Sequence, residues 1–225
     1  MAFSRINQLP ARPTTATLTG QMVGIGMNFA GDATPCPNIE DTLIFASDVG
    51  MVDGDLRVLG VLVQWVEVHQ AHVNAERLIR ALREHPETRV RVFWAALGAW
   101  LGKDRRYARL LTLYTGQPVD LLPVGNDFQI ERRGEDERFA CTCLRVPTGT
   151  LRRRPADVLS PTDLARQHPG YRNRVLMGPT WRADVWTALE ADPTLSVAAA
   201  ARKASCAFAT AWQVKQDFNV LRAAC

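Results

Sequence analysis

Apolar residues recur at spacings of three and four positions through the first half of the chain, and polar breaks separate five such stretches. This period is typical of amphipathic α-helices. Asn38 is expected to cap the first helix and Asp53 or Asp55 the second, because their side chains accept hydrogen bonds from free N–H groups. Pro86 and Gly116 are expected to end later ones. The predicted helices are Ile39–Val49, Leu56–His69, Asn74–Glu84, Val90–Leu101 and Arg105–Tyr114.

The pattern changes on both sides of this helical array, which spans residues 38–116. Residues 1–37 contain four prolines, and we expect a loose arm with at most one ordered segment, residues 22–31. Residues 117–178 are expected to form a small β-containing region, closed as a hairpin by a polar turn at 132–137, and a proline-rich connector with one helix. The strand candidates are Val119–Val124, Phe128–Ile130 and Arg138–Val146, and the helix is Thr162–Gln167.

Residues 179–225 return to helical spacing in three short segments. Ser196 is a suitable cap for the second of them, whose run of four alanines would let two helices cross closely. Residues 205–207 form a short turn before the third. The predicted helices are Arg182–Glu190, Val197–Ala204 and Phe208–Leu221, and the third is expected to bury Ala211, Val214, Phe218 and Leu221. The fold class predicted is therefore mainly α: an antiparallel helical array, a small β-containing region and a C-terminal tri-helical unit.

The stretch VAAAARKASCAFATAWQV, residues 197–214, resembles the helix-turn-helix of resolvases, invertases and many small bacterial repressors. Ala201 occupies the family's small-residue position and Cys206 the hydrophobic position after the turn. Thr210 and Gln213 match positions that touch DNA in the family. Ser205 stands where the family has glycine, so its backbone is expected to take a positive φ. Ala207 replaces the usual Ser or Thr cap, and the resemblance covers about a fifth of the chain.

The resemblance implies that the third helix enters a groove of duplex DNA. Arginines of the connector are expected to contact phosphates beside it. The predicted DNA-binding residues are Phe208, Ala209, Thr210, Trp212, Gln213, Lys215 and Gln216 on the third helix, Arg202 and Lys203 on the second, and Arg152, Arg153, Arg154, Arg172, Arg174 and Arg182. The alternatives are a three-helix bundle that only packs on the rest of the protein or binds a partner, an RNA-binding unit, and a solvated arginine cluster.

The charge distribution agrees with this expectation. The chain carries a net charge of +4, but residues 145–225 contain twelve Lys or Arg against six Asp or Glu, a local charge of +6. A basic region beside a slightly acidic one is typical of proteins in which one end contacts nucleic acid. The five cysteines show no disulfide framework, and the apolar stretches are interrupted and too short to span a bilayer.

Candidates for other chemistry are weak. His69 and His72 could share a helix face near Glu67 or Glu76, but a structural zinc site needs four ligands, so we expect surface or capping histidines. Cys141 and Cys143 lack a second pair of ligands. Gly24-Ile25-Gly26 lacks the third glycine and the preceding strand of a dinucleotide site. We therefore expect no metal, no cofactor and no catalytic residues.

The sequence favours a sequence-specific DNA-binding protein, a bacterial repressor or autoregulator located in the cytoplasm rather than an enzyme. Because one helix-turn-helix reads only a few base pairs, a homo-oligomer is expected. The helical array is the candidate oligomerisation surface, because its apolar content exceeds what one helical layer would cover. The alternative is an antitoxin or accessory subunit of a defence or recombination system, in which this array docks a partner protein.

Overall fold

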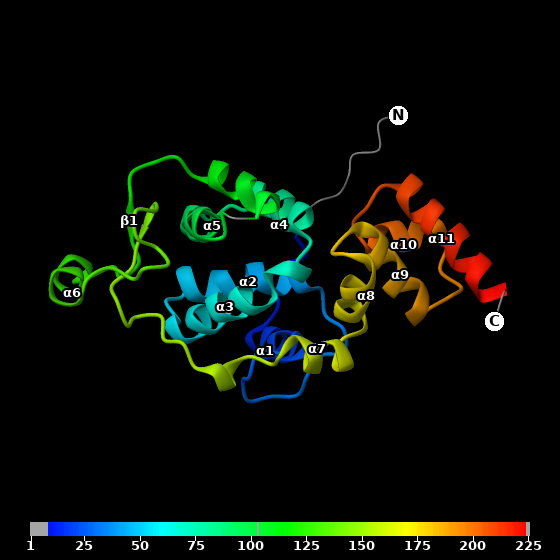
Figure 1. Ribbon diagram of the computed structural model, residues 1–225, viewed down its shortest axis with the longest axis horizontal. Coiled ribbons are helices and arrows are strands. Elements are labelled where there is room, and N and C mark those ends of the chain that lie inside the picture. Colours follow the sequence, from blue (N-terminus) through cyan, green and yellow to red (C-terminus); the bar gives the residue numbers. More distant parts are fainter. Residues whose placement is uncertain (1–8, 103, 224–225) are drawn as a thin grey trace.

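The computed structural model describes residues 9–102 and 104–223, and helices make up most of it (Figure 1). Residues 9–177 form a body whose helices are α1 (Thr15–Gly24), α2 (Ile39–Met51), α3 (Leu56–His69), α4 (Ala75–Arg83), α5 (Thr88–Trp100), α6 (Asn126–Arg133), α7 (Pro161–Gln167) and α8 (Pro169–Met177), with 3-10 helices η1 (Gln70–His72), η2 (Arg105–Leu113) and η3 (Pro155–Asp157). In Figure 1, α2 and α3 lie side by side at the centre, between the layer of α4, α5 and η2 and the layer of α1 and α7. The mainly α fold class is confirmed.

The helix starts follow from their capping side chains. Asn38 Oδ1 accepts the Asp41 N–H at 3.0 Å, as predicted. Asp55, rather than Asp53, caps α3, because its Oδ1 accepts the N–H groups of Arg57 and Val58, both at 3.0 Å. The predicted bounds of α3 agree with the structure, and the segment predicted as Arg105–Tyr114 is helical but of the tighter 3-10 form.

The core of the body is large and rich in aromatic side chains. Trp65, Phe93 and Trp94 are 0 % exposed, and the two indoles donate to the Ile25 carbonyl at 2.7 Å and to Ser47 Oγ at 3.0 Å. The apolar residues that prompted the expectation of self-association are therefore covered within the chain itself. Residues of α1, α7 and α8 complete the core, so the apolar content of the helical array gives no reason to expect an oligomer. Self-association remains a prediction that rests only on the small number of base pairs that one helix-turn-helix can read.

The expected loose arm is wrong for residues 15–21, which belong to α1, and the order at 22–27 falls within the one segment expected to be ordered. Thr14 caps α1, and the helix buries Leu18 and Met22, followed by buried Ile25 and Met27. The prolines of this segment precede α1 and α2 instead of interrupting them, so they shape the connections and leave the helix intact.

The middle region also differs from the predicted hairpin. Strands β1 (Val119–Asp120) and β2 (Leu144–Arg145) pair in parallel, with Val119 opposite Leu144. The segment Phe128–Ile130, predicted as a strand, lies within α6, which begins after Gly125 at φ 74° and ends at Gly134 at φ 78°. Glycine adopts this backbone without the clash of a Cβ, so the two residues delimit a helix that connects the parallel strands. This lobe lies at the opposite end of the molecule from the C-terminus (Figure 1).

Candidate nucleic-acid interface

Residues 181–223 form a separate unit of three helices with its own small core. They are α9 (Trp181–Ala191), α10 (Val197–Lys203) and α11 (Phe208–Ala223). Ser196 caps α10 as predicted, since its Oγ accepts the Ala199 N–H at 3.1 Å. The core is made by Val185, Leu189, Ala200, Ala201, Ala204, Ala211, Val214 and Phe218. The alanines of α10 allow α11 to pack closely across it, as the sequence predicted.

The turn between α10 and α11 is closed by two backbone hydrogen bonds. The Ser205 N–H donates to the Arg202 carbonyl at 3.1 Å, and the Cys206 N–H donates to the Ala201 carbonyl at 2.9 Å. This is the Schellman pattern, which requires a left-handed residue after the helix. Ser205 is that residue, at φ 52°, so the predicted positive φ is confirmed. The pattern fixes the direction in which α11 leaves α10.

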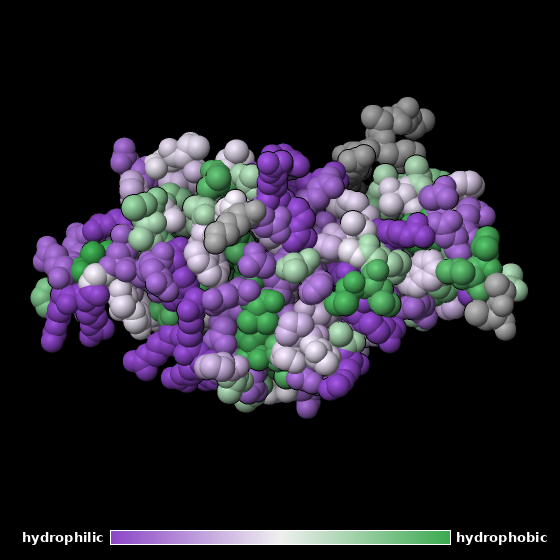
Figure 2. Space-filling view, viewed as in Figure 1, coloured by the Kyte–Doolittle hydropathy of each residue, from purple (hydrophilic) through white to green (hydrophobic). Residues whose placement is uncertain are grey.

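Helix α11 buries one face and exposes the other. Ala211, Val214 and Phe218 are buried as predicted. Leu221, also predicted to be buried, is 55 % exposed because it lies in the last turn, beyond the reach of the core. Figure 2 shows a hydrophobic area at this end of the helix. The exposed residues from 208 to 220 are Phe208, Ala209, Trp212, Gln213, Gln216, Asn219 and Val220, and Thr210 is half-buried. Most of the predicted base-contacting residues therefore lie together on the accessible face of α11.

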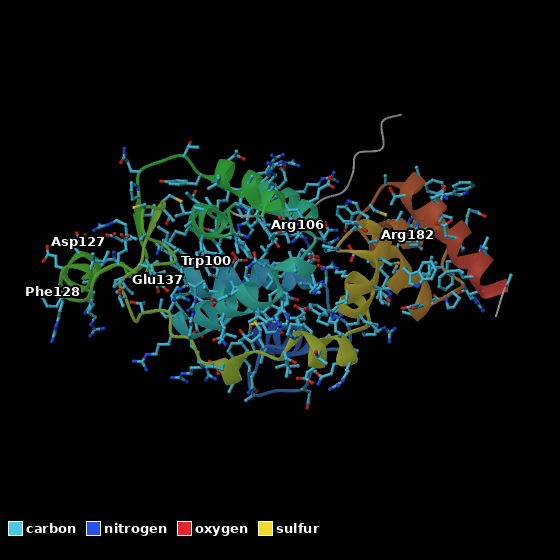
Figure 3. All side chains as sticks on the ribbon, viewed as in Figure 1. Trp100, Arg106, Asp127, Phe128, Glu137 and Arg182 are labelled. Atoms are coloured by element: carbon cyan, nitrogen blue, oxygen red, sulfur yellow. The ribbon has the colours of Figure 1, made fainter. Side chains whose placement is uncertain are left out.

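Cations border this exposed face. Arg202 and Lys203 are exposed in the last turn of α10, immediately before the turn into α11. Arg182 of α9 donates to Asp217 of α11 at 2.8 Å, and Figure 3 labels its position beside the helix. Lys215 donates to the Leu195 carbonyl, which holds its ammonium group at the edge of α11. These four cations therefore lie on or beside α11.

Two predicted phosphate contacts on α8 have different surroundings. Arg172 is exposed, 3.7 Å from Glu190. Arg174 is only 2 % exposed and cannot contact DNA, so its prediction is wrong. Its guanidinium makes five hydrogen bonds: to Asp184 Oδ1 from Nε at 2.9 Å and Nη2 at 2.8 Å, to Glu40 at 2.7 and 2.9 Å, and to the His72 carbonyl at 3.3 Å. These contacts use all the N–H donors of the side chain.

The run Arg152–Arg154 lies away from α11. Gln64 of α3 exchanges two hydrogen bonds with the backbone of Arg154, both at 2.8 Å, and Arg153 pairs with Glu67. In Figure 1 this segment passes below α3, whereas α11 is at the far end of the molecule. The expectation that these arginines lie beside the recognition helix is therefore wrong, because α3 binds their backbone to the body. Much of the +6 charge of residues 145–225 is consequently not at the three-helix unit.

A buried cluster of charges joins the unit to the body. Glu40 and Asp41 come from α2, Arg77 from α4, Arg174 from α8 and Asp184 from α9; we call these five residues the interdomain cluster. Arg77 donates to both oxygens of Asp41 at 3.0 and 2.9 Å and to the carbonyl of Ala204, the residue that follows α10, at 3.4 Å. The cluster therefore connects α2, α4 and α8 to α9 and α10.

Within the interdomain cluster, burial raises the pKa of Asp41 and of Asp184, whereas the charged forms of Glu40 and Arg174 are favoured by their partners. Burial alone would raise the pKa of Glu40, but the charge and hydrogen bonds of Arg174, the charge of Arg77 and the Asn74 N–H together lower it. Burial would likewise lower the pKa of Arg174, and the charges of Asp184 and Glu40 raise it instead. Ion pairs in this environment require specific geometry, so the cluster fixes the orientation of the three-helix unit.

The other candidate residues have structural roles. His69, predicted to lie at the surface or to cap a helix, is 0 % exposed, with Nδ1 accepting from the Tyr171 hydroxyl at 2.9 Å and Nε2 donating to the Leu159 carbonyl at 3.1 Å. Because the apolar spacing of α3 places it on the inner face, its imidazole is satisfied inside the core. Cys141 lies in a turn at φ 61°, and Cys143 precedes β2, so neither cysteine is on a strand. No group of three metal-ligating side chains occurs among residues 9–102 and 104–223.

None of the helices in the described part of the chain is long and apolar enough to cross a membrane. Comparisons of the chain with protein-family models, with curated proteins and with solved structures found no match.

Proposed function

We propose that the protein binds duplex DNA through α11 and acts as a transcriptional regulator. The observation that carries the proposal is the exposed face of α11 from residue 208 to 220, which is uncharged and bordered by cations on α9 and α10. A helix of this kind fits the major groove, where its outer side chains reach base edges while the flanking cations contact phosphates. The close α10–α11 turn is the geometry that such a helix needs to project from its unit.

The interdomain cluster supports the same proposal. DNA recognition depends on the orientation of the helix that reads the bases, and the cluster links α9 and the end of α10, against which α11 packs, to the body. We also propose that two copies bind together, because a single recognition helix contacts only a few base pairs. Two protected half-sites, separated by about one helical turn of DNA, are then expected in a footprint.

The experiment is fluorescence anisotropy with the full-length protein, using duplex from upstream of its own gene and a random duplex, between low and moderate salt. Affinity should fall as salt rises, because bound cations release counterions from the DNA. The double substitution Arg202→Glu/Lys203→Glu should weaken binding to both duplexes. The matched control is Arg132→Glu/Arg133→Glu, which makes the same charge change in the last turn of α6, at the other end of the molecule.

Two outcomes would reject DNA binding through this surface, and a third would reject the regulatory role alone. One is a wild-type protein that fails to bind either duplex at low salt. Another is an equal loss from the α10 and α6 double substitutions, which would show only a general effect of net charge. Equal affinity for the upstream and random duplexes would reject the regulatory part of the proposal and leave DNA binding in place.

A further inference from the structure

The exposed surface of α11 has an unusual composition for a helix that faces water. Each of the exposed residues from 208 to 220 is uncharged. They divide into two chemical types: the side-chain amides of Gln213, Gln216 and Asn219, and the apolar groups of Phe208, Ala209, Trp212 and Val220. Phe208 is 55 % exposed and Trp212 48 %, so both aromatic rings are accessible to a partner.

The charged side chains of residues 208–220 form hydrogen bonds within the protein. Lys215 is half-buried and donates to the Leu195 carbonyl. Asp217 accepts from Arg182 at 2.8 Å and from the Gln213 amide at 3.5 Å. Lys215 and Asp217 therefore lie at the edges of the exposed face, and each charged group is hydrogen-bonded within the protein. The surface between them presents only amides and apolar groups.

Base edges in the major groove differ in what they require. Guanine is read by Arg or Lys and the amino group of cytosine by Asp or Glu, whereas adenine pairs with Asn or Gln and the thymine methyl group with apolar side chains. Between residues 208 and 220, the exposed side chains of α11 belong only to the types that suit adenine and thymine. This part of α11 therefore matches A·T pairs, whereas the exposed cation Arg222 lies beyond it, in the last turn of the helix.

We infer that α11 reads A·T base pairs, with Ala209 and Trp212 packing on thymine methyl groups and the amides of Gln213 and Gln216 pairing with adenine. The inference rests on the proposed function, since it specifies the sequence that the same helix would read. Gln213 retains a free acceptor oxygen for this role, because its hydrogen bond to Asp217 uses only the NH₂ group. Arg182, Arg202 and Lys203 remain at the border of the face for phosphates.

The test begins with selection of bound duplexes from a random-sequence pool by the full-length protein. The selected half-sites should be dominated by A·T pairs. Each thymidine of the selected duplex is then replaced in turn by deoxyuridine, which keeps the base pair and removes only the methyl group. Each contacted methyl group should contribute about fourfold in affinity, the value expected for burying one CH₂-sized group.

Two variants identify the side chain responsible. Trp212→Ala should bind the thymidine and deoxyuridine duplexes with the same affinity at the position that it contacts, because the methyl group has lost its partner. Trp212→Gln provides a polar alternative of intermediate size. Phe128→Ala removes a comparably exposed aromatic ring from α6, at the far end of the molecule (Figure 3), and should keep the full response to deoxyuridine. Thermal unfolding of each variant confirms that it is folded.

The outcomes separate the two proposals. Selection of G·C-rich half-sites, or unchanged affinity at every deoxyuridine position, overturns the inference and leaves DNA binding intact. Failure to select any duplex at low salt overturns the proposed function itself and excludes α11 as a DNA reader. A Trp212→Ala protein that remains folded and keeps the wild-type response to deoxyuridine at every position overturns the assignment of Trp212.

Discussion

The body and the three-helix unit differ in how each is held together. The body buries Trp65, Trp94 and Tyr171 in one continuous core, whereas the core of the unit consists of four alanines and only four larger side chains. A chain segment of about forty residues is close to the lower limit for a domain that folds without further support. The interdomain cluster supplies that support, so the unit depends on the body more than the body depends on the unit.

The two regions also differ in where their aromatic side chains lie. The body encloses its aromatic rings, while the unit leaves Trp212 and Phe208 exposed on α11. Scattered exposed apolar residues need no explanation, but an exposed aromatic pair one helical turn apart points to a contact surface. The part of the molecule with the smaller core therefore presents the surface that we propose to bind DNA.

The largest expected effect comes from breaking the interdomain cluster. Arg174→Met removes the cation between Glu40 and Asp184 and leaves both carboxylates buried beside one another. Loss of one partner from such a buried pair costs about 3–5 kcal/mol of unfolding free energy. Urea unfolding followed by tryptophan fluorescence measures it.

The matched control for this prediction is Arg172→Met, which changes an exposed arginine two positions earlier on the same helix. It should alter the unfolding free energy by no more than about 0.5 kcal/mol. Equal stability of the Arg172 and Arg174 variants would show that the cluster does not hold the unit on the body.

The second prediction tests the body alone. Burial lowers the pKa of His69 from 6.5 to about 4, against a smaller opposing effect of the Leu159 carbonyl. The unfolded chain takes up a proton below pH 6.5 and the folded protein does not, so this residue's contribution to stability is lost as the pH falls from about 6.5 to about 4. The total loss is about 3 kcal/mol, since each pKa unit corresponds to about 1.4 kcal/mol.

Unfolding free energies measured between pH 7 and pH 4 check this prediction. The substitution His69→Gln keeps a polar side chain at the position and removes the titrating group, so its curve should be flatter than that of the wild type. The buried His168 also has a lowered pKa, caused first by burial, and contributes a remaining slope in both proteins. Parallel curves for wild type and variant would assign the pH dependence to other groups.

The third prediction concerns recognition by the unit. Gln213→Ala should weaken binding to the selected duplex by about 1–3 kcal/mol and reduce the preference over random DNA, because a paired adenine loses both its contacts. Gln167→Ala, an exposed glutamine in α7, should leave affinity unchanged. Equal weakening on selected and random DNA, or no change on either, would exclude Gln213 as a base-reading residue.

Much of the fold could be predicted from local sequence patterns. Asn38, Asp55 and Ser196 cap their helices as expected because capping depends on a few neighbouring backbone groups. Helix α8 does not follow from these patterns, because Pro169 falls within the proline-rich stretch that predicts a connector. In the structure this proline occupies the first turn of the helix, where no N–H is needed, and His168 caps the start. A proline can begin a helix or interrupt one, and only tertiary contacts distinguish the two.

The candidate site was predictable only in part. The exposed residues of α11 follow from helical periodicity, which the sequence displays directly. The positions of Arg174 and of Arg152–Arg154 cannot be predicted from periodicity. They depend on contacts with Glu40 and Gln64, which are more than eighty residues away in sequence. The net charge of residues 145–225 therefore overestimates the positive charge near α11. The neighbours of an arginine in the sequence do not show which distant residue it contacts in the fold.

The smallest expected effect concerns the turn between α10 and α11. Ser205 holds a left-handed backbone at φ 52°, which a Cβ disfavours and glycine adopts freely. Ser205→Gly should stabilise the unit by about 0.5–1 kcal/mol, after allowance for the greater freedom of glycine in the unfolded chain. Ala198→Gly, an exposed position within α10, should instead destabilise it by about 1 kcal/mol. Amide hydrogen exchange of α10 and α11 measures both changes in the full-length protein. Glycine should thus increase protection from exchange when it replaces Ser205 and decrease protection when it replaces Ala198, seven positions earlier. Decreased protection in both variants would show that the left-handed turn is not maintained in solution.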